Sequence, residues 1–237
     1  MLKFSHFIQE SQWMYHGTTE NDIESLKPQR DSYMLDRAIG SHFAADPLVS
    51  QKFASGLYKS TENNMSGTVF KTRTPKRSEL EVVYEKTYKH DAKQSDQSAI
   101  AAHVASTVLG HPDNKDMFKI WIKHTRKIDD DMADEIHGLL SKGKAPANEK
   151  FGTARAKNAN SFRTYINNFD SNISDSPTPT FKQEIISKFH DIMAKKGKKG
   201  LVYQNTSPME TSGIRSRKSY VIFHPEQLPL ERHESCS

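Results

Sequence analysis

The chain has 237 residues, with 34 Lys and Arg against 29 Asp and Glu, and a formal net charge of +5. Hydrophobic residues make up only 35% of it and the mean hydropathy is −0.77, so we expect one core, or one core with an insert, carrying exposed helices and polar loops. The lone cysteine, Cys236, excludes an internal disulfide, disfavours a cysteine nucleophile and fits a reducing compartment. No stretch predicts a membrane-spanning helix, and the first residues lack the apolar core of a secretory signal.

The first part of the chain predicts short strands and short helices. Strands are predicted at 13–16, 41–44, 68–72 and 80–84. A capping-box pattern at Thr19 predicts a short helix that carries Ile23 and Leu26 on one side. Asp46, followed by proline, predicts a helix N-terminus, and this helix should end near Gly56.

From 96 to 197 the apolar spacing becomes helical, and we interpret its stripes as core contacts. The stripes are Ile100/Val104/Val108, Met117/Ile120/Trp121/His124, Met132/Ile136/Leu139/Leu140, Phe162/Ile166/Phe169 and Phe181/Ile185/Phe189/Ile192. Strand patterns return at 200–203 and 219–223. The order of strands, helices and strands predicts an α+β fold, in which the outer parts pair into one sheet system and the helical block is an insert.

Several common chemistries have no signature here. A His-Glu-x-x-His motif is absent and the eleven histidines are scattered, so no metal site is predicted. Phosphate-loop, Gly-x-Gly-x-x-Gly and Gly-x-Ser-x-Gly motifs are also absent, which argues against NTPase, Rossmann and hydrolase-elbow chemistry. The basic runs 195–199 and 215–218 are interpreted as solvated surface, with attraction to phosphates as the alternative.

One ordered set of short motifs stands out. Tyr15-His16-Gly17-Thr18 is followed by Gly40-Ser-His-Phe-Ala44, a helix with Ser50 and Phe53, the segments 200–205 and 219–228, and Glu210 between those segments. In this order they resemble the diphtheria-toxin-like and poly(ADP-ribose)-polymerase-like ADP-ribosyltransferases, especially phage-encoded members. The resemblance covers roughly 12–84 and 198–230, and it implies an ADP-ribosyltransferase-like split β-sheet core with a large helical insert.

This resemblance implies a site for NAD, which would be a substrate. The residues that would bind it are His16, Gly17, Thr18, His42, Phe43, Ser50 and Phe53. His16 would hydrogen-bond the adenosine-side ribose, and Gly17 would offer its backbone to the nicotinamide amide. His42 and Phe53 would flank the nicotinamide ring, and Ser50 would add a hydrogen bond to the carboxamide.

The implied catalytic set is Glu210, His16 and His42. Cleavage of the nicotinamide–ribose bond passes through an oxocarbenium-like state, and Glu210 would hold the ribose hydroxyl and stabilise the cation. The chain departs from the family twice: His42 stands where a tyrosine is usual, and Ser219 stands where the polymerases carry their glutamate. The alternatives are a structural His16, a core Phe53 and a solvated Glu210.

The segments then divide into a leader at 1–13, a core at 14–95 and 198–230, an insert at 96–197 and a tail at 231–237. Residues 1–11 resemble the capsid-targeting peptides of internal head proteins of T-even-type phages. The match to their cleavage signal is Ile8-Gln9-Glu10, so a prohead protease would cut after Glu10. The alternative is a short N-terminal helix packed on the domain.

The function expected from these resemblances is transfer of ADP-ribose from NAD to a host macromolecule, chiefly protein, with release of nicotinamide. The enzyme would act in the host cytoplasm, packaged in the virion beforehand, with neither a metal nor a membrane involved. One alternative is an enzyme like the RNA 2′-phosphotransferases or one that ADP-ribosylates RNA, which the pair His16 and His42 and the basic charge also fit. Another is a non-catalytic virion or host-factor-binding protein on the same scaffold.

Overall fold

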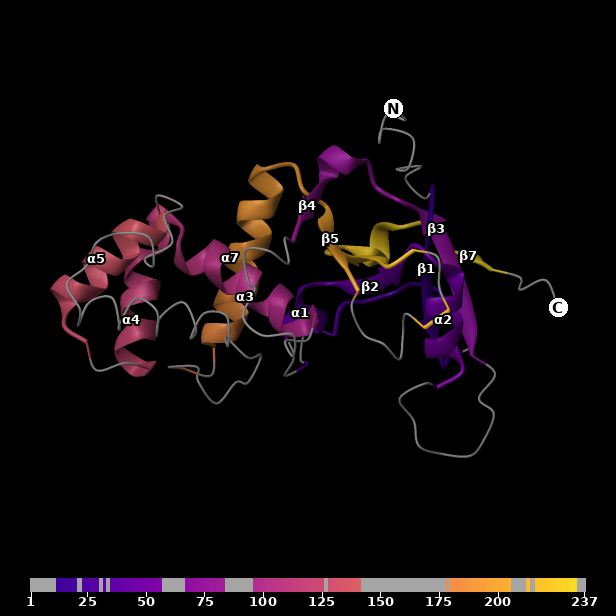
Figure 1. The fold of residues 1–237 in the computed structure, drawn as a ribbon, viewed down its shortest axis with the longest axis horizontal. Coiled ribbons are helices and arrows are strands. Elements are labelled where there is room, and N and C mark those ends of the chain that lie inside the picture. The colour runs from indigo at the N-terminus through magenta and orange to yellow at the C-terminus, as the bar shows by residue number, and fades with distance from the viewer. Residues whose placement is uncertain are drawn as a thin grey trace, which may run out of the picture. The chain divides into compact units, whose positions relative to one another are not determined.

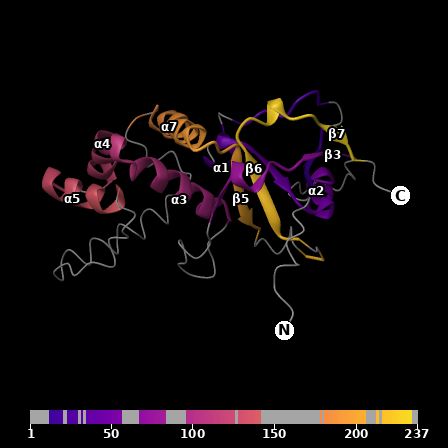
Figure 2. The same cartoon turned by 90° about the horizontal axis from the view of Figure 1, so that it is seen from above.

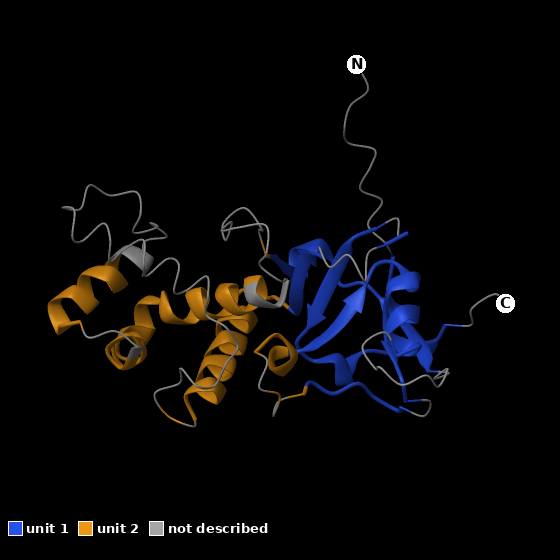
Figure 3. Cartoon of the chain, turned by 60° about the horizontal axis from the view of Figure 1, so that its bottom comes forward, with its two compact units in different colours: residues 1–28, 40–82, 199–237 blue, residues 29–39, 83–198 orange. Residues whose placement is uncertain are grey.

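The structure is a computed structural model that describes residues 12–20, 23–29, 32, 35–56, 67–83, 96–125, 128–141, 178, 180–205, 212–213 and 216–233. The chain forms two compact units, which Figure 3 shows in different colours. The sheet unit comprises residues 1–28, 40–82 and 199–237, and the helical unit comprises 29–39 and 83–198. Residues 29–39, within the segment assigned to the core from the sequence, thus belong to the helical unit.

Among the described residues, the sheet unit is built on seven strands in the order β4-β5-β6-β2-β1-β3-β7. The strands are β1 Trp13–Thr18, β2 Ser41–Ala44, β3 Thr68–Arg73, β4 Leu80–Val82, β5 Gly200–Gln204, β6 Lys218–Ile222 and β7 Glu231–Arg232. Neighbouring strands are antiparallel except for the parallel pair β4 and β5. The molecule is therefore a mixed α and β structure, consistent with the predicted α+β class. Strand β7 is an addition, because its residues had been predicted to be part of a tail.

One face of the sheet carries an apolar cluster. Its buried members are Met14, Leu26, Phe43, Ala45, Leu80, Tyr220 and Ile222, and Ile23, Val202, Leu228 and Leu230 pack against them. Successive side chains of a strand point to opposite faces. The neighbours of the cluster residues within each strand, such as His42 beside Phe43 and Tyr203 beside Val202, therefore belong to the other face.

Helix α2, Pro47–Ala54, packs against β1, β2 and β3 (Figure 1). The side chain of Asp46 caps its N-terminus by accepting from the amide of Leu48 at 3.0 Å, and Pro47 occupies the first turn. The chain leaves the helix through Gly56, whose φ of 80° suits a glycine. The cap and the glycine stop predicted from the sequence are both confirmed.

The helix predicted after Thr19 is wrong for the residues that the structure describes. Residues 23–29 contain no helix, yet Ile23 and Leu26 pack against the apolar cluster as the stripe predicted. Pro28 follows so closely that little room remains for helical turns. An irregular segment can bury two apolar residues three positions apart, so the spacing identified the buried residues but not their backbone.

The helical unit contains α1 Leu35–Ile39, α3 Asp96–Leu109, α4 Lys115–Thr125, α5 Asp130–Ser141 and α7 Phe181–Lys195. Helices α1, α3 and α7 pack together, while α4 lies beside α5 (Figure 2). The predicted stripe of α7 is confirmed, because Phe181, Ile185, Phe189 and Ile192 are all buried. The short helix α1 was not predicted. The stripe predicted from Phe162 to Phe169 lies outside the described residues.

In α4 the predicted stripe is partly wrong. Trp121 is buried as predicted, but Ile120 is 54% exposed and His124 is exposed. The buried face instead includes Phe118 and Ile122. These residues and Trp121 follow a spacing of three and four residues as well as the predicted set does, so the periodicity alone did not fix the rotation of the helix.

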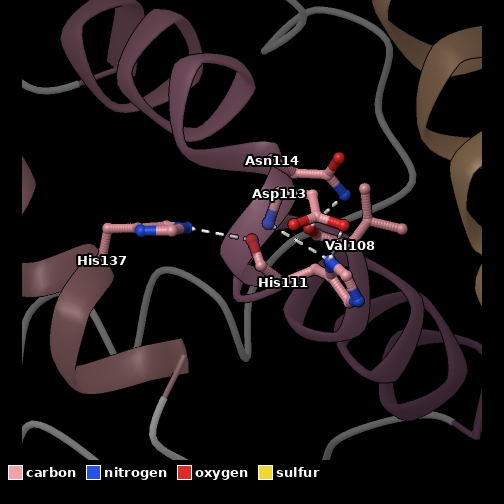
Figure 4. Close-up of polar contacts among 5 residues, drawn as sticks. All are labelled: Val108, His111, Asp113, Asn114 and His137. Atoms are coloured by element: carbon pink, nitrogen blue, oxygen red, sulfur yellow. Dashed lines mark hydrogen bonds and ion pairs between the residues drawn. The ribbon is translucent and has the colours of Figure 1, made fainter.

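A polar cluster stabilises the turn between α3 and α4 and its contact with α5 (Figure 4). The imidazole Nε2 of His137 lies 3.1 Å from the carbonyl oxygen of His111, and the Asn114 amide donates to the carbonyl oxygen of Val108 at 2.9 Å. His111 Nδ1 accepts from the backbone amide of Asp113 at 3.3 Å. These bonds satisfy main-chain groups at a helix end, so we interpret the cluster as structural.

Candidate functional site

The ladder between the first two strands of the sheet unit is short. Strand β1 is paired with β3 along its whole length, as far as Thr18 opposite Thr68. With β2, whose residues are all described like those of β1, it shares only the registered pair Tyr15 and Ala44. The β1–β2 ladder therefore ends at Tyr15, although β1 continues for three more residues to Thr18.

His16 bridges the two strands where this ladder ends. Its Nδ1 atom lies 2.7 Å from the carbonyl oxygen of His42. A carbonyl oxygen only accepts, so Nδ1 carries the proton and donates. Strand carbonyls lie close to the plane of the sheet, so the imidazole must reach between β1 and β2. In a continued ladder, the carbonyl of His42 would accept a hydrogen bond from a backbone amide of β1. Here it accepts from the side chain of His16 instead.

His16 is held in its neutral form. Burial lowers the pKa of its imidazole, the hydrogen bond to the His42 carbonyl acts in the opposite direction, and the His42 side chain lowers it again. With a proton on Nδ1 and no net charge, Nε2 keeps a lone pair and is a hydrogen-bond acceptor. A neutral histidine with a fixed tautomer is suited to accept from a hydroxyl group.

Phe43 supports this imidazole from the apolar side. Its ring is 5.4 Å from the His16 ring between centroids, at an interplanar angle of 55°. Phe43 is 3% exposed and belongs to the apolar cluster. Phe43, which was predicted to bind NAD, therefore packs against His16 on the side of the apolar cluster and restricts the movement of the His16 ring.

Gly17 is required by the packing of α2. A Cβ atom added there would lie 1.8 Å from the carbonyl oxygen of Ser50 and 3.0 Å from the amide nitrogen of Ala54. Both are main-chain atoms of the helix, so no rotamer change relieves the overlap. The helix already covers Gly17 on that face of the sheet. A ligand that used the backbone of Gly17 would approach along the edge that faces β2.

The other residues predicted to bind NAD include Ser50 and Phe53 on α2 and Thr18 on β1. Ser50 is 2% exposed, and Phe53, further along α2, is half-buried. Thr18 is half-buried at the end of β1, and its hydroxyl accepts from the amide of Glu20 at 3.1 Å. The structure therefore brings the segments bearing His16, Gly17, Ser50 and Phe53 together through the contacts of β1 with β2 and α2.

Tyr203 on β5 joins this group through His42. Its hydroxyl lies 3.1 Å from Nδ1 of His42, and the two rings are nearly perpendicular, at 82°. The strand that carries Tyr203 was predicted from the sequence, but no role was predicted for its side chain. The alternation of Leu201 and Tyr203 with the cluster residue Val202 was the signal that could have placed it on the face of His42.

Ser219 on β6 is 3% exposed. In register it lies between Ala44 of β2 and Tyr203 of β5. By alternation it shares their face, because its neighbour Tyr220 belongs to the apolar cluster. A hydroxyl rather than a carboxylate therefore occupies this point beside the His42 and Tyr203 pair.

Glu210 lies outside the described residues, in the connection between β5 and β6. Two residues further along this connection, the carbonyl oxygen of Ser212 accepts from the ammonium group of Lys52 at 2.9 Å. Lys52 directly precedes Phe53 on α2. The connection that contains Glu210 is thus attached to the helix that carries two of the predicted binding residues.

Among the described residues, His, Cys, Asp and Glu side chains form no group of three or more that could hold a metal ion. Within the same part of the chain, no helix has both the length and the apolar character needed to cross a membrane. No family model matches the chain, and no curated protein or solved structure is significantly similar to it.

Proposed function

We propose that the sheet unit is an NAD-dependent ADP-ribosyltransferase. The observation that carries the proposal is the early end of the β1–β2 ladder at Tyr15, with the His16 imidazole hydrogen-bonded to the His42 carbonyl beyond it. Beyond the last registered pair, Gly17 has no registered partner on β2 and lies next to a hydrogen-bonded imidazole. Two of the motifs that resemble this enzyme family, at 15–18 and 40–44, lie on these two strands.

The proposed reaction breaks the bond between nicotinamide and C1′ of its ribose. Nicotinamide leaves with the electron pair of that bond, and a nucleophile of the acceptor forms a new bond to C1′. The acceptor loses a proton to the solvent, so the products are the ADP-ribosylated acceptor, nicotinamide and a proton. The transition state resembles an oxocarbenium ion, so catalysis depends on holding both riboses and on negative charge near C1′.

The contacts of the described residues support one proposed orientation of the dinucleotide. Neutral His16 would accept from a hydroxyl of the adenosine-side ribose through Nε2, since Nδ1 is committed to the His42 carbonyl. The backbone of Gly17 would meet the carboxamide of nicotinamide from the edge that faces β2. The half-buried rings of His42 and Phe53 would flank the nicotinamide, with Ser50 supporting the carboxamide.

Glu210 is proposed as the catalytic carboxylate, binding the hydroxyl of the nicotinamide ribose. The attachment of Ser212 to Lys52 supports this choice, because it ties the β5–β6 connection to α2. Ser219 cannot supply the charge, since its hydroxyl is neutral at physiological pH. If Glu210 does not reach the site, the protein would bind NAD and transfer ADP-ribose only slowly.

The acceptor is proposed to be a host protein. This rests on the resemblance to phage enzymes and on the leader-like residues 1–11, which lie outside the described residues. Delivery with the phage DNA, after cleavage behind Glu10, would place the enzyme in the host cytoplasm. Protease and nuclease treatment of a labelled product separates a protein acceptor from an RNA acceptor.

The test is incorporation of ADP-ribose from NAD labelled in the adenylate part into a bacterial lysate, with release of nicotinamide measured in parallel. We expect incorporation with the full-length chain and a strong loss with His16→Ala and with Glu210→Ala. His224→Ala and Glu226→Ala remove a histidine and an acid elsewhere in the sheet unit and should leave incorporation unchanged. Equal incorporation by all five proteins, or none by folded wild type, would overturn the proposal.

A further inference from the structure

We propose that Tyr203 is a positioning residue of the NAD site, whose hydroxyl fixes the orientation of the His42 imidazole. This inference rests on the proposed function and extends it to Tyr203, to which the family resemblance assigns no role. The need for such a residue arises at position 42. A histidine ring has a broad, roughly two-fold torsion about its last side-chain bond, so its two edges exchange easily unless a partner distinguishes them.

Tyr203 provides that distinction. Its hydroxyl is 3.1 Å from Nδ1 of His42, and the perpendicular rings, 6.2 Å apart between centroids, bring the phenol edge to the imidazole without stacking over it. Rotation of the imidazole by half a turn would replace Nδ1 with a carbon atom and remove the hydrogen bond. The hydroxyl therefore selects one ring orientation of His42.

The sheet topology makes this contact rigid. His42 lies on β2 and Tyr203 on β5, and β6 is hydrogen-bonded between the two strands. In register His42 faces Val221, and Tyr203 faces Ser219 two residues earlier on β6. Both side chains therefore project from the same face, and their separation is set by the strand spacing rather than by a loop.

The same pair compensates for the departure from the family pattern. Where the related enzymes carry a tyrosine on this strand, the chain has His42, a smaller ring. Tyr203 supplies a phenol from β5, the strand beyond β6, and its hydroxyl lies 3.1 Å from Nδ1 of the imidazole. The carbonyl of His42 is at the same time bonded to His16, so one residue connects Tyr203 to the ribose-binding histidine. Displacement of His42 would therefore disturb its bonds to both His16 and Tyr203, and with them the proposed binding of NAD.

The deciding variant is Tyr203→Phe, which keeps the ring and removes the hydroxyl. Tyr220→Phe is the matched control, because it removes a hydroxyl from the adjacent strand on the opposite, apolar face of the sheet. Nitrogen-15 NMR of the full chain reports the tautomer of the His42 imidazole without any ligand. Binding of NAD and transfer kinetics are measured on the same proteins.

We expect Tyr203→Phe to alter the nitrogen signals of His42 and to weaken NAD binding about 5- to 10-fold, the value of one hydrogen bond. Tyr220→Phe should leave both unchanged. In a His42→Tyr background, where the imidazole is absent, Tyr203→Phe should have little further effect on NAD binding. A similar loss in both backgrounds would show that Tyr203 acts independently of His42 and would overturn the inference.

The two proposals fail in different ways. Wild type that binds no NAD, although folded, contradicts the proposed function itself. Wild type that binds NAD, together with a Tyr203→Phe protein of equal affinity and an unchanged His42 signal, contradicts only the positioning role.

Discussion

The ammonium group of Lys52 donates to the carbonyl oxygen of Ser212 at 2.9 Å, which joins helix α2 to the connection between β5 and β6. This bond links residues that are 160 positions apart in the chain. The helix carries Phe53 and the connection contains Glu210, so the Lys52 side chain attaches the proposed acid-bearing segment to the proposed nicotinamide-binding helix.

Lys52→Met should therefore lower the rate of transfer more than the affinity for NAD. We expect kcat to fall about 3- to 10-fold, as for the loss of one hydrogen bond, with little change in KM. Lys27→Met, which removes an exposed cation of the same unit, is the control. Steady-state kinetics of nicotinamide release provides both constants. An equal effect of the two variants would point to loss of positive charge rather than of the attachment.

Glu210→Gln should separate binding from catalysis. The amide keeps the size and one acceptor of the side chain but cannot offset the charge of an oxocarbenium ion. We expect kcat to fall about 100- to 1,000-fold, as for the loss of a group that stabilises transition-state charge. Calorimetric affinity for NAD should stay nearly constant, as it should in Glu226→Gln. Full activity of Glu210→Gln would require another carboxylate to be the catalytic group.

The stability of the sheet unit should fall as the pH is lowered. Burial lowers the pKa of His16 in the folded state, so the unfolded chain binds more protons below its ordinary pKa of about 6.5. The contribution of His16 to the free energy of unfolding is therefore complete above that pH. It is lost as the pH falls from there through the lower pKa of His16 in the folded state. His137 behaves alike in the helical unit, where burial also lowers its pKa.

His16→Asn should remove this dependence in the sheet unit alone, since the amide can still donate to the His42 carbonyl but does not titrate. Fluorotryptophan labelling gives one fluorine signal for Trp13 in the sheet unit and one for Trp121 in the helical unit. Urea titrations at pH 7.5 and 5.5 should show a smaller pH effect at Trp13 in the variant and an unchanged effect at Trp121. An unchanged effect at Trp13 would mean that His16 is accessible to protons in the folded state.

Local patterns predicted much of the sheet unit. Strands at 41–44 and 68–72 came from short runs of strand-favouring residues, and α2 came from the cap at Asp46. The residues that form each of these signals lie within a few positions of one another, so each signal can be recognised in a single sequence. The early end of the β1–β2 ladder was not predicted, because it depends on how β2 also pairs with β6.

Long-range contacts account for what the sequence did not predict. His42 and Tyr203 are separated by 161 positions, so no local spacing could have paired them. Gly17 was predicted for a ligand-binding reason, whereas the structure gives a packing reason in the main chain of α2. The motif at Tyr15 drew attention to His16 and Gly17, but the contacts of each depend on the strand or helix that lies against it.

Gly17→Ala should destabilise the sheet unit severely, because its Cβ would be 1.8 Å from the carbonyl oxygen of Ser50. Helix α2 would have to move away from β1, and we expect a loss of about 3 kcal/mol or more, the upper part of the range for overpacking. Gly138→Ala is a matched control in α5, where an added Cβ meets nothing within 4 Å. There alanine should stabilise by about 0.5–1 kcal/mol, since it suits a helix interior better than glycine. In urea titrations the loss should appear at the Trp13 signal and the gain at the Trp121 signal; a Gly17→Ala protein of normal stability would show that α2 does not lie against Gly17.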